Sequence, residues 1–131
     1  MRVLALDYGR ARCGCALSDP TGTIVTPIEV VTNPTSKRGF AQLGELVRER
    51  EVQRVVVGLP LSLRGEDTDQ TRETRWFAAR LSRRLGAEIP VELHDERLTT
   101  QLARRTPSAT SSEDSRAAAH MLESWLAARS Q

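Results

Sequence analysis

Apolar positions in the first third of the chain fall into three short blocks, at residues 2–8, 12–18 and 23–31. Turn-forming residues separate them, at positions 9–10 after the first block and 19–22 after the second. Short apolar blocks divided by Gly, Pro and Asp are typical of strands joined by tight turns. The pattern therefore predicts an antiparallel meander of three strands.

Two helices and a buried strand are predicted in the middle third. Residues 36–51 have apolar side chains three or four positions apart, which indicates an amphipathic helix. These side chains are Phe40, Leu43, Leu46 and Val47.

The β-branched run at residues 54–58 is typical of a strand buried on both faces in a parallel arrangement. The second helix has apolar residues at four-residue steps, namely Phe77, Leu81 and Leu85. Its C-cap is predicted at Gly86.

The last third predicts one more strand and a terminal helix. The strand spans residues 90–93, a short helix is expected from Leu98, and residues 106–112 form a small polar loop. The apolar face of the terminal helix consists of Ala118, Met121, Leu122, Trp125 and Leu126. The whole order, βββαβαβα with a minor helix before the last one, predicts an α/β fold of the ribonuclease H-like type. Its mixed five-stranded sheet has three antiparallel strands, then alternating helices and strands, and helices flank it.

Length and composition indicate one soluble domain. The 131 residues are enough to bury a single core, so residues 1–131 are expected to form one domain. Cys13 and Cys15 lie on the same face of a predicted strand, which is too constrained for a disulfide between them. No apolar stretch approaches the roughly 18 residues of a membrane span, and the N-terminus enters a strand directly. We therefore expect a cytoplasmic protein without membrane contact.

Acidic residues stand where three of the predicted elements begin or end. Asp7 closes the apolar run of the first strand, and Asp114 opens the terminal helix. Asp95 and Glu96 follow the fifth strand, and successive strand residues point to opposite faces, so the pattern does not choose between them. Ligand sites form outside the carboxyl ends of parallel strands. Convergent carboxylates there would supply the hard oxygen ligands that Mg²⁺ and Mn²⁺ prefer, which predicts metal-assisted phosphodiester chemistry.

Each acidic position also has an ordinary structural explanation. An Asp before Gly commonly starts a turn, as Asp7 does. Asp95 and Glu96 suit a solvated strand end, and Asp114 suits a helix cap stabilised by the helix dipole. A competing acidic cluster in a hydrated polar loop consists of Glu66, Asp67 and Asp69. Neither of the two histidines is predicted to be catalytic.

The net charge of +2 is only weakly basic and does not by itself indicate a nucleic-acid partner. The basic residues are almost all arginine, with Lys37 the only lysine, and arginine binds phosphate in a bidentate way. The best basic surface comprises Arg72, Arg75, Arg80, Arg83 and Arg84 on the second helix, with Arg104 and Arg105 further on. A solvated helix face explains such a run equally well. Because aromatic residues are few, phosphate contacts are favoured over base stacking.

Several motifs, in this order along the chain, are similar to those of one known family. They are Leu6-Asp7-Tyr8-Gly9 with Arg12 and Gly14, residues 16–19, residues 57–60, the D-E-R-L-T-T run at 95–100, and Asp114 ahead of two alanines. Together they resemble the YqgF/RuvX family, Holliday junction resolvase-like proteins described as pre-16S rRNA nucleases. The match runs over nearly the whole chain, and D-E-R-L-T-T is its most specific part.

The resemblance implies a ribonuclease H-like, Mg²⁺- or Mn²⁺-dependent phosphodiesterase. It implies catalytic, metal-binding carboxylates at Asp7, Glu96 and Asp114, and so favours Glu96 over Asp95. The implied substrate is the 16S rRNA precursor, processed at its 5′ end during ribosome biogenesis. The chain departs from the family at residues 106–112, a Ser/Thr-rich stretch where members usually carry several lysines.

Nucleic-acid contacts are expected from Arg12, Arg72, Arg75 and Arg104. Other functions remain open at this stage. A Holliday junction resolvase would act on four-way DNA, normally as a dimer. A non-catalytic binding module would bind nucleic acid without metal-dependent cleavage. A sugar-kinase or actin-like ATPase would need a duplicated domain, for which the chain has no room. The sequence does not decide between a monomer and a homodimer.

Overall fold

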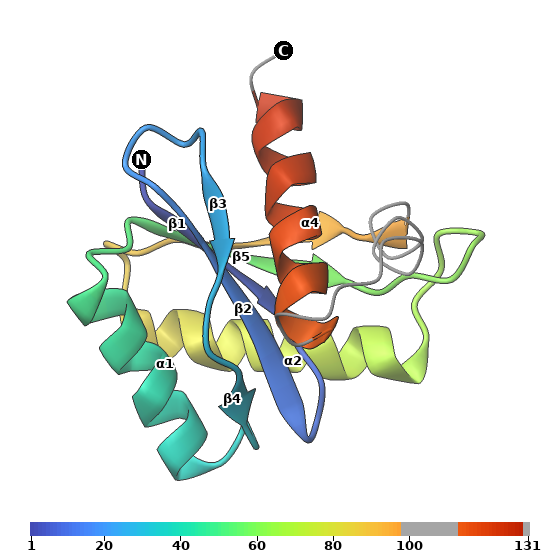
Figure 1. Ribbon diagram of the computed structural model, residues 1–131. Helices are drawn as coiled ribbons and strands as arrows, with labels where there is room; N and C mark the ends of the chain where they lie inside the picture. Colours follow the sequence, from blue (N-terminus) through green and yellow to red (C-terminus); the bar gives the residue numbers. More distant parts are fainter. Residues whose placement is uncertain (98–112, 130–131) are drawn as a thin grey trace.

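The computed structural model describes residues 1–97 and 113–129, which form a sheet with helices on both sides (Figure 1). The strands are β1 (Val3–Asp7), β2 (Arg12–Ser18), β3 (Val25–Pro27), β4 (Val31–Thr32), β5 (Arg54–Leu59) and β6 (Val91–Asp95). The helices are α1 (Lys37–Glu49), α2 (Asp69–Leu85) and α4 (Glu113–Arg129). The predicted short helix from Leu98, the loop at 106–112 and Arg104 lie outside the described residues.

The sheet has the order β3-β2-β1-β5-β6, and β4 also pairs with β2. β1 is antiparallel to β2 and parallel to β5, which is in turn parallel to β6. The predicted mixed sheet and its parallel strands are therefore confirmed. One detail differs, because the sheet has six strands and the predicted strand 23–31 is divided into β3 and β4. β3 ends at Pro27, which has no backbone N–H to continue a ladder.

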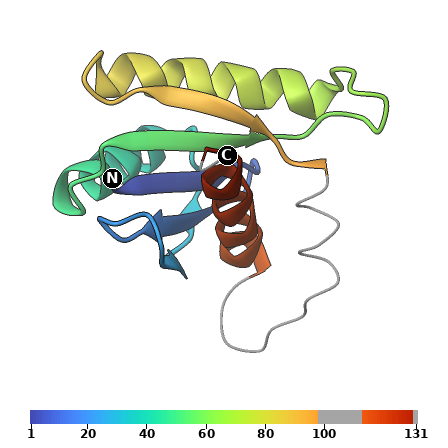
Figure 2. The same ribbon diagram turned by 90° about the horizontal axis from the view of Figure 1, so that it is seen from above.

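Side chains alternate across the strands and so divide the core into two layers. The layer beneath α1 and α2 contains Leu4, Leu6, Val55 and Val57 of the sheet and Phe40, Leu43, Phe77 and Leu81 of the helices. The layer beneath α4 contains Val3, Ala5, Ala16 and Val56 of the sheet and Ala118, Met121, Leu122 and Trp125 of the helix. In Figures 1 and 2, α4 lies on one side of the strands and α2 on the other.

Three of the predicted helices, α1, α2 and α4, are confirmed. Ser36 caps α1 by accepting a hydrogen bond from the Gly39 backbone N–H. Thr68 and Thr71 form a reciprocal capping box at the start of α2, and Gly86, with φ of 83°, ends this helix as predicted. Cys13 and Cys15 are buried free thiols. No helix in the described part of the chain is long and apolar enough to cross a membrane.

Candidate active site

Asp7 occupies the carboxyl end of β1 and lies on the α4 side of the sheet. Its side chain follows the same alternation as Val3 and Ala5, both of which pack in the α4 layer. On one side Asp7 is paired with Gly14 of β2. On the other side the parallel register of β1 and β5 brings Gly58 next to it. Asp7 therefore stands between two glycines in the middle of the sheet.

These two glycines make room for the other acidic residues. A Cβ atom at Gly14 would lie 2.0 Å from the backbone oxygen of Asp114. A Cβ atom at Gly58 would lie 2.3 Å from Oε2 of Glu96. Both distances are far inside van der Waals contact, so any larger residue would push these groups away. Glycine within a strand often marks such a close approach. The sequence pattern alone assigned no separate role to Gly14 or Gly58, although their position within strands was a signal of this kind.

The side on which Glu96 lies follows from its neighbours in β6. Glu92 accepts a hydrogen bond from Trp125 Nε1 at 2.9 Å, and His94 Nε2 lies 3.2 Å from Ser124 Oγ. Both partners belong to α4. Because residues alternate along β6, Glu96 projects to the α4 side as well.

The structure thus separates the two acidic residues that the sequence pattern left equivalent. The side chain of Glu96 forms a hydrogen bond with Asp7. Asp95 is instead paired with Arg97, at 2.7 Å from Nη2 to Oδ2. Glu96 is accordingly the residue that joins Asp7, as the family resemblance favours.

Asp114 lies in the first turn of α4, which is fixed to the strands by its neighbour. Ser115 Oγ donates to the carbonyl of Ile28 at 2.8 Å and accepts from the Cys15 N–H at 3.3 Å. The Asp114 carboxylate accepts from Arg12 Nε at 2.9 Å. It is also close enough for its negative charge to raise the pKa of Asp7.

Burial and mutual repulsion make it costly to ionise both carboxyls of the central pair. Desolvation and the charge of Asp114 raise the pKa of Asp7 to about 6, although the hydrogen bond with Glu96 acts in the opposite direction. Desolvation and the charge of Asp7 raise the pKa of Glu96 to about 8. At neutral pH the pair therefore retains a proton, which the two carboxyls share.

The donor set suits a hard divalent cation, because it consists of carboxylate oxygens crowded by negative charge. Asp7 and Glu96 are already in contact, whereas Asp114 is held by Arg12. Within residues 1–97 and 113–129, no three His, Cys, Asp or Glu side chains are arranged to hold a metal ion as they stand. Asp114 would have to turn from Arg12 toward Asp7 to complete such a set.

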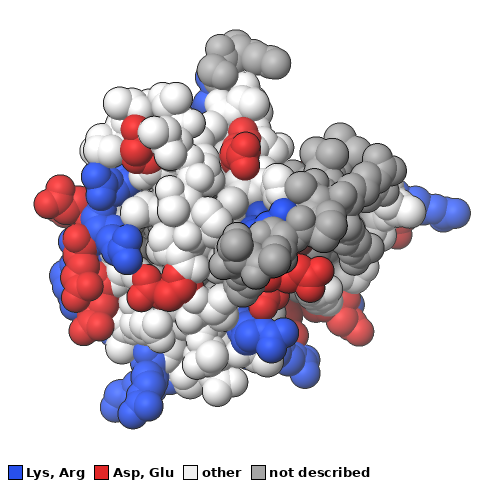
Figure 3. Space-filling model, viewed as in Figure 1, with Lys and Arg blue, Asp and Glu red and all other residues white. Residues whose placement is uncertain are grey.

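The predicted basic contacts are mostly engaged in ion pairs. Arg72 pairs with Asp69, and Arg75 with Asp67 at 3.0 Å. The acidic cluster that competed for a metal is thus partly neutralised by α2. Among the residues coloured in Figure 3, acidic and basic groups are interspersed over the face that α4 covers and form no continuous basic surface. Among the predicted basic contacts that the structure describes, Arg12 borders the carboxylates.

A family model described as RuvX, Holliday junction resolvase, matches residues 1–128. The chain belongs to the RuvX family. A relative from Maridesulfovibrio salexigens is 40% identical, with 97% of this chain and 98% of the relative covered. One from Anaeromyxobacter sp. (strain Fw109-5) is 41% identical, with 98% of each covered. Both are named "Putative pre-16S rRNA nuclease". Membership of the RuvX family and these relatives support a nuclease role.

Solved structures confirm the ribonuclease H-like fold of this RuvX-family chain. T. thermophilus RuvC in complex with a Holliday junction substrate superimposes with a TM-score of 0.67 and 17% identity, covering 99% of this chain and 96% of RuvC. The Fowlpox virus resolvase, in complex with Holliday junction DNA, gives a TM-score of 0.61 at 9% identity over the full length of both chains. At such identities the likeness concerns the fold.

Proposed function

We propose that this RuvX-family chain is a divalent-metal-dependent endonuclease that cleaves phosphodiester bonds at the 5′ end of the 16S rRNA precursor. The observation that carries the proposal is the half-buried Asp7–Glu96 pair beside Asp114, with Asp7 at the carboxyl end of β1 and Glu96 just beyond β6. The names of the relatives favour RNA as the substrate. A role in ribosome biogenesis would place the protein in the cytoplasm.

The three carboxylates would hold the Mg²⁺ or Mn²⁺. A bound ion would activate the attacking water and stabilise charge on the phosphoryl oxygens during an in-line displacement. The Asp7–Glu96 pair would lose its shared proton on binding, because a divalent cation removes the repulsion that keeps the pair protonated. Asp114 would turn toward Asp7, which frees the Arg12 guanidinium to contact the scissile strand.

Cleavage of labelled RNA tests the proposal. The protein is incubated with a 5′ precursor fragment of 16S rRNA in Mg²⁺, in Mn²⁺ or in EDTA. We expect defined cuts with either metal and none in EDTA. RNA that is bound but remains intact with both metals would indicate a non-catalytic binding module.

Resolution of Holliday junctions is the second candidate, and the family description and the fold shared with RuvC favour it. The same carboxylates would then act on DNA, with two copies of the chain on one four-way junction. A labelled junction is therefore added to the RNA experiment under matched salt and metal. Symmetric nicking of the junction, with the RNA left intact, would select this candidate. The mass of the protein in solution, free and bound, distinguishes a monomer from a homodimer.

A further inference from the structure

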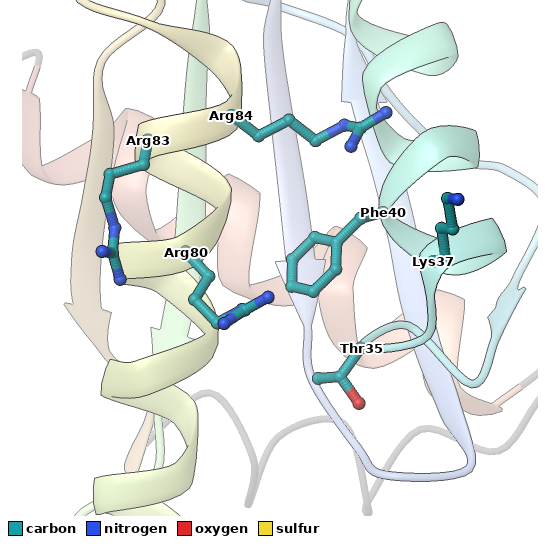
Figure 4. Close-up of a pocket in the computed structure, with 6 residues that line it drawn as sticks. All are labelled: Thr35, Lys37, Phe40, Arg80, Arg83 and Arg84. Atoms are coloured by element: carbon teal, nitrogen blue, oxygen red, sulfur yellow. The ribbon is translucent and has the colours of Figure 1, made fainter.

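A basic pocket of about 410 Å³ lies between the first turn of α1 and the C-terminal half of α2 (Figure 4). Its lining comprises Thr35, Lys37, Phe40, Arg80, Arg83 and Arg84. Both helices cover the side of the sheet opposite α4, so the pocket is separate from the carboxylate site. Among the described lining residues four are cationic and none is acidic.

The cations of this pocket differ from those at the other end of the same helix. Arg72 and Arg75 are each paired with an aspartate. None of the four pocket cations forms an ion pair with another residue of the described chain. Lys37 also stands in the first turn of α1, which contains no acidic residue and where the helix dipole is already positive. Unneutralised positive charge in a concave site favours an anion.

One lining arginine, Arg80, is held in place before any ligand arrives. The Arg80 guanidinium carbon lies 5.6 Å from the ring centroid of Phe40 and 5.0 Å from that of Trp76. Contacts with two rings restrict the side chain and leave its donors available. Figure 4 shows Arg80 and Arg84 extending from α2 toward α1, where Lys37 stands. A restricted guanidinium loses less entropy on binding a phosphate.

We infer that this pocket binds backbone phosphates of a nucleic-acid strand, as a second contact with the substrate away from the carboxylates. The inference rests on the proposed function for the identity of the strand. The positive charges of the pocket come from two helices and face an open space. They therefore suit the successive phosphates of a strand better than they suit one compact anion. The strand would be gripped here without being cut, because no carboxylate lines the pocket among the described residues.

Equilibrium binding of a labelled precursor RNA in EDTA tests the inference, since cleavage cannot then interfere. The pocket variant is Lys37→Gln/Arg84→Gln. The control is Arg38→Gln/Arg48→Gln, which removes the same charge from exposed positions of α1 that do not line the pocket. Matching thermal transitions would show that both variants are folded.

The pocket variant should bind about fivefold or more weakly than wild type, and the control less than about twofold. For a single strand, the slope of log K against log salt should fall by roughly 1.4 in the pocket variant, for two lost phosphate contacts. Equal losses in both variants would mean that only bulk charge matters and would overturn the inference. Unchanged affinity of the pocket variant, or no RNA binding by the wild type, would overturn it as well.

Two further outcomes separate this inference from the proposed function. Wild-type protein that binds RNA through the pocket but never cuts it would refute the nuclease and leave the pocket assignment intact. Normal metal-dependent cutting, with pocket and control variants binding alike, would refute only the pocket assignment. Inorganic triphosphate serves as a small-anion probe. If it raises the melting temperature through Lys37 and Arg84 while RNA affinity does not depend on them, the pocket serves a small anion and the inference fails.

Discussion

Near Asp7, the two sides of the sheet differ in the size of the residues that cover them. On the side of α1 and α2, Phe77 stacks on Tyr8 at 4.5 Å and on Phe40 at 5.8 Å between ring centroids. On the α4 side, Gly14 and Gly58 flank Asp7 and leave space for other groups. Large side chains fill a core, whereas small ones allow backbone and carboxylates to approach. The comparison indicates that the sheet is closely packed by aromatic rings on one side of this region and leaves room for the carboxylates on the other.

The two sides also differ in charge. The α4 side gathers carboxylates that repel one another, and the pocket on the opposite side gathers four cations that form no ion pair with a described residue. A substrate that contacts both would have to extend around an edge of the sheet. Long RNA meets this requirement, and a short oligonucleotide does not. Comparing substitutions on the α4 side with substitutions on the α1/α2 side therefore tests how far the roles of the two sides are separate.

The largest effect is expected from Asp7→Asn, which keeps the shape of the side chain and removes its charge. Cleavage should fall by about a thousandfold or more, equivalent to about 4 kcal/mol of transition-state stabilisation. The melting temperature should not decrease, because the substitution also removes a partly desolvated charge that Asp114 repels. Single-turnover cleavage and thermal unfolding measure the two quantities. Undiminished cleavage would transfer the catalytic assignment to Glu66, Asp67 and Asp69, and a lost thermal transition would make Asp7 structural.

The opposite result is expected from Leu81→Ala on the other side. Leu81 is fully buried in the layer beneath α1 and α2. Its truncation should lower the free energy of unfolding by about 3 to 4 kcal/mol, through lost burial and the cavity left behind. Cleavage per folded molecule, measured well below the melting temperature, should stay within about twofold of wild type. A large loss of catalysis in the folded variant would show that the two sides are coupled.

Much of this architecture could be predicted from the sequence, because period-two and helical patterns report which face of each element is buried. The apolar stripe of α4 and the Gly86 cap are examples. The division of strand 23–31 was missed, since the effect of Pro27 depends on which backbone groups of β2 face it. The residue pattern likewise left Asp95 and Glu96 equivalent; the family resemblance favours Glu96, and the contacts of β6 with α4 give the physical reason.

The site was harder to predict than the fold because its parts meet only through cross-strand register. The position of Gly14 opposite Asp7 is a property of the β1–β2 pairing. The arginines of α2 look equivalent in sequence, yet Arg75 is neutralised by Asp67 from the preceding loop, and Arg84 faces an open pocket. Such differences depend on loop geometry, which local patterns do not encode.

A pair of Gly→Ala substitutions compares the packing on the two sides directly. Gly14→Ala places a methyl group against backbone atoms of α4, which cannot move independently, and should cost about 3 kcal/mol of stability. It should also weaken catalysis by displacing Asp114.

Gly44→Ala, in the middle of α1, meets only the flexible Arg84 side chain at 3.4 Å. It should be neutral or stabilising by up to about 1 kcal/mol. Urea unfolding measures both, and equal costs would contradict the proposed difference in packing.

The smallest expected effect is a pH dependence confined to the α4 side. In EDTA, the folded protein retains a proton on Asp7 or Glu96 that the unfolded chain has released, because both carboxyls have raised pKa values, about 6 and about 8. The free energy of unfolding should therefore fall as pH rises above the unfolded-state values near 4. Each retained proton contributes about 1.4 kcal/mol per pH unit, or about 2 kcal/mol from about pH 5.5 to about pH 7.

Glu96→Gln, which still donates to Asp7 but does not titrate, should lose most of this slope. Saturating Mg²⁺ should also reverse the loss in wild type by binding the ionised folded state. Urea unfolding at the two pH values, with EDTA or Mg²⁺, measures these slopes. If the free energy of unfolding of the wild type in EDTA depends on pH no more steeply than that of the variant, the folded structure does not raise the pKa values of the Asp7–Glu96 pair.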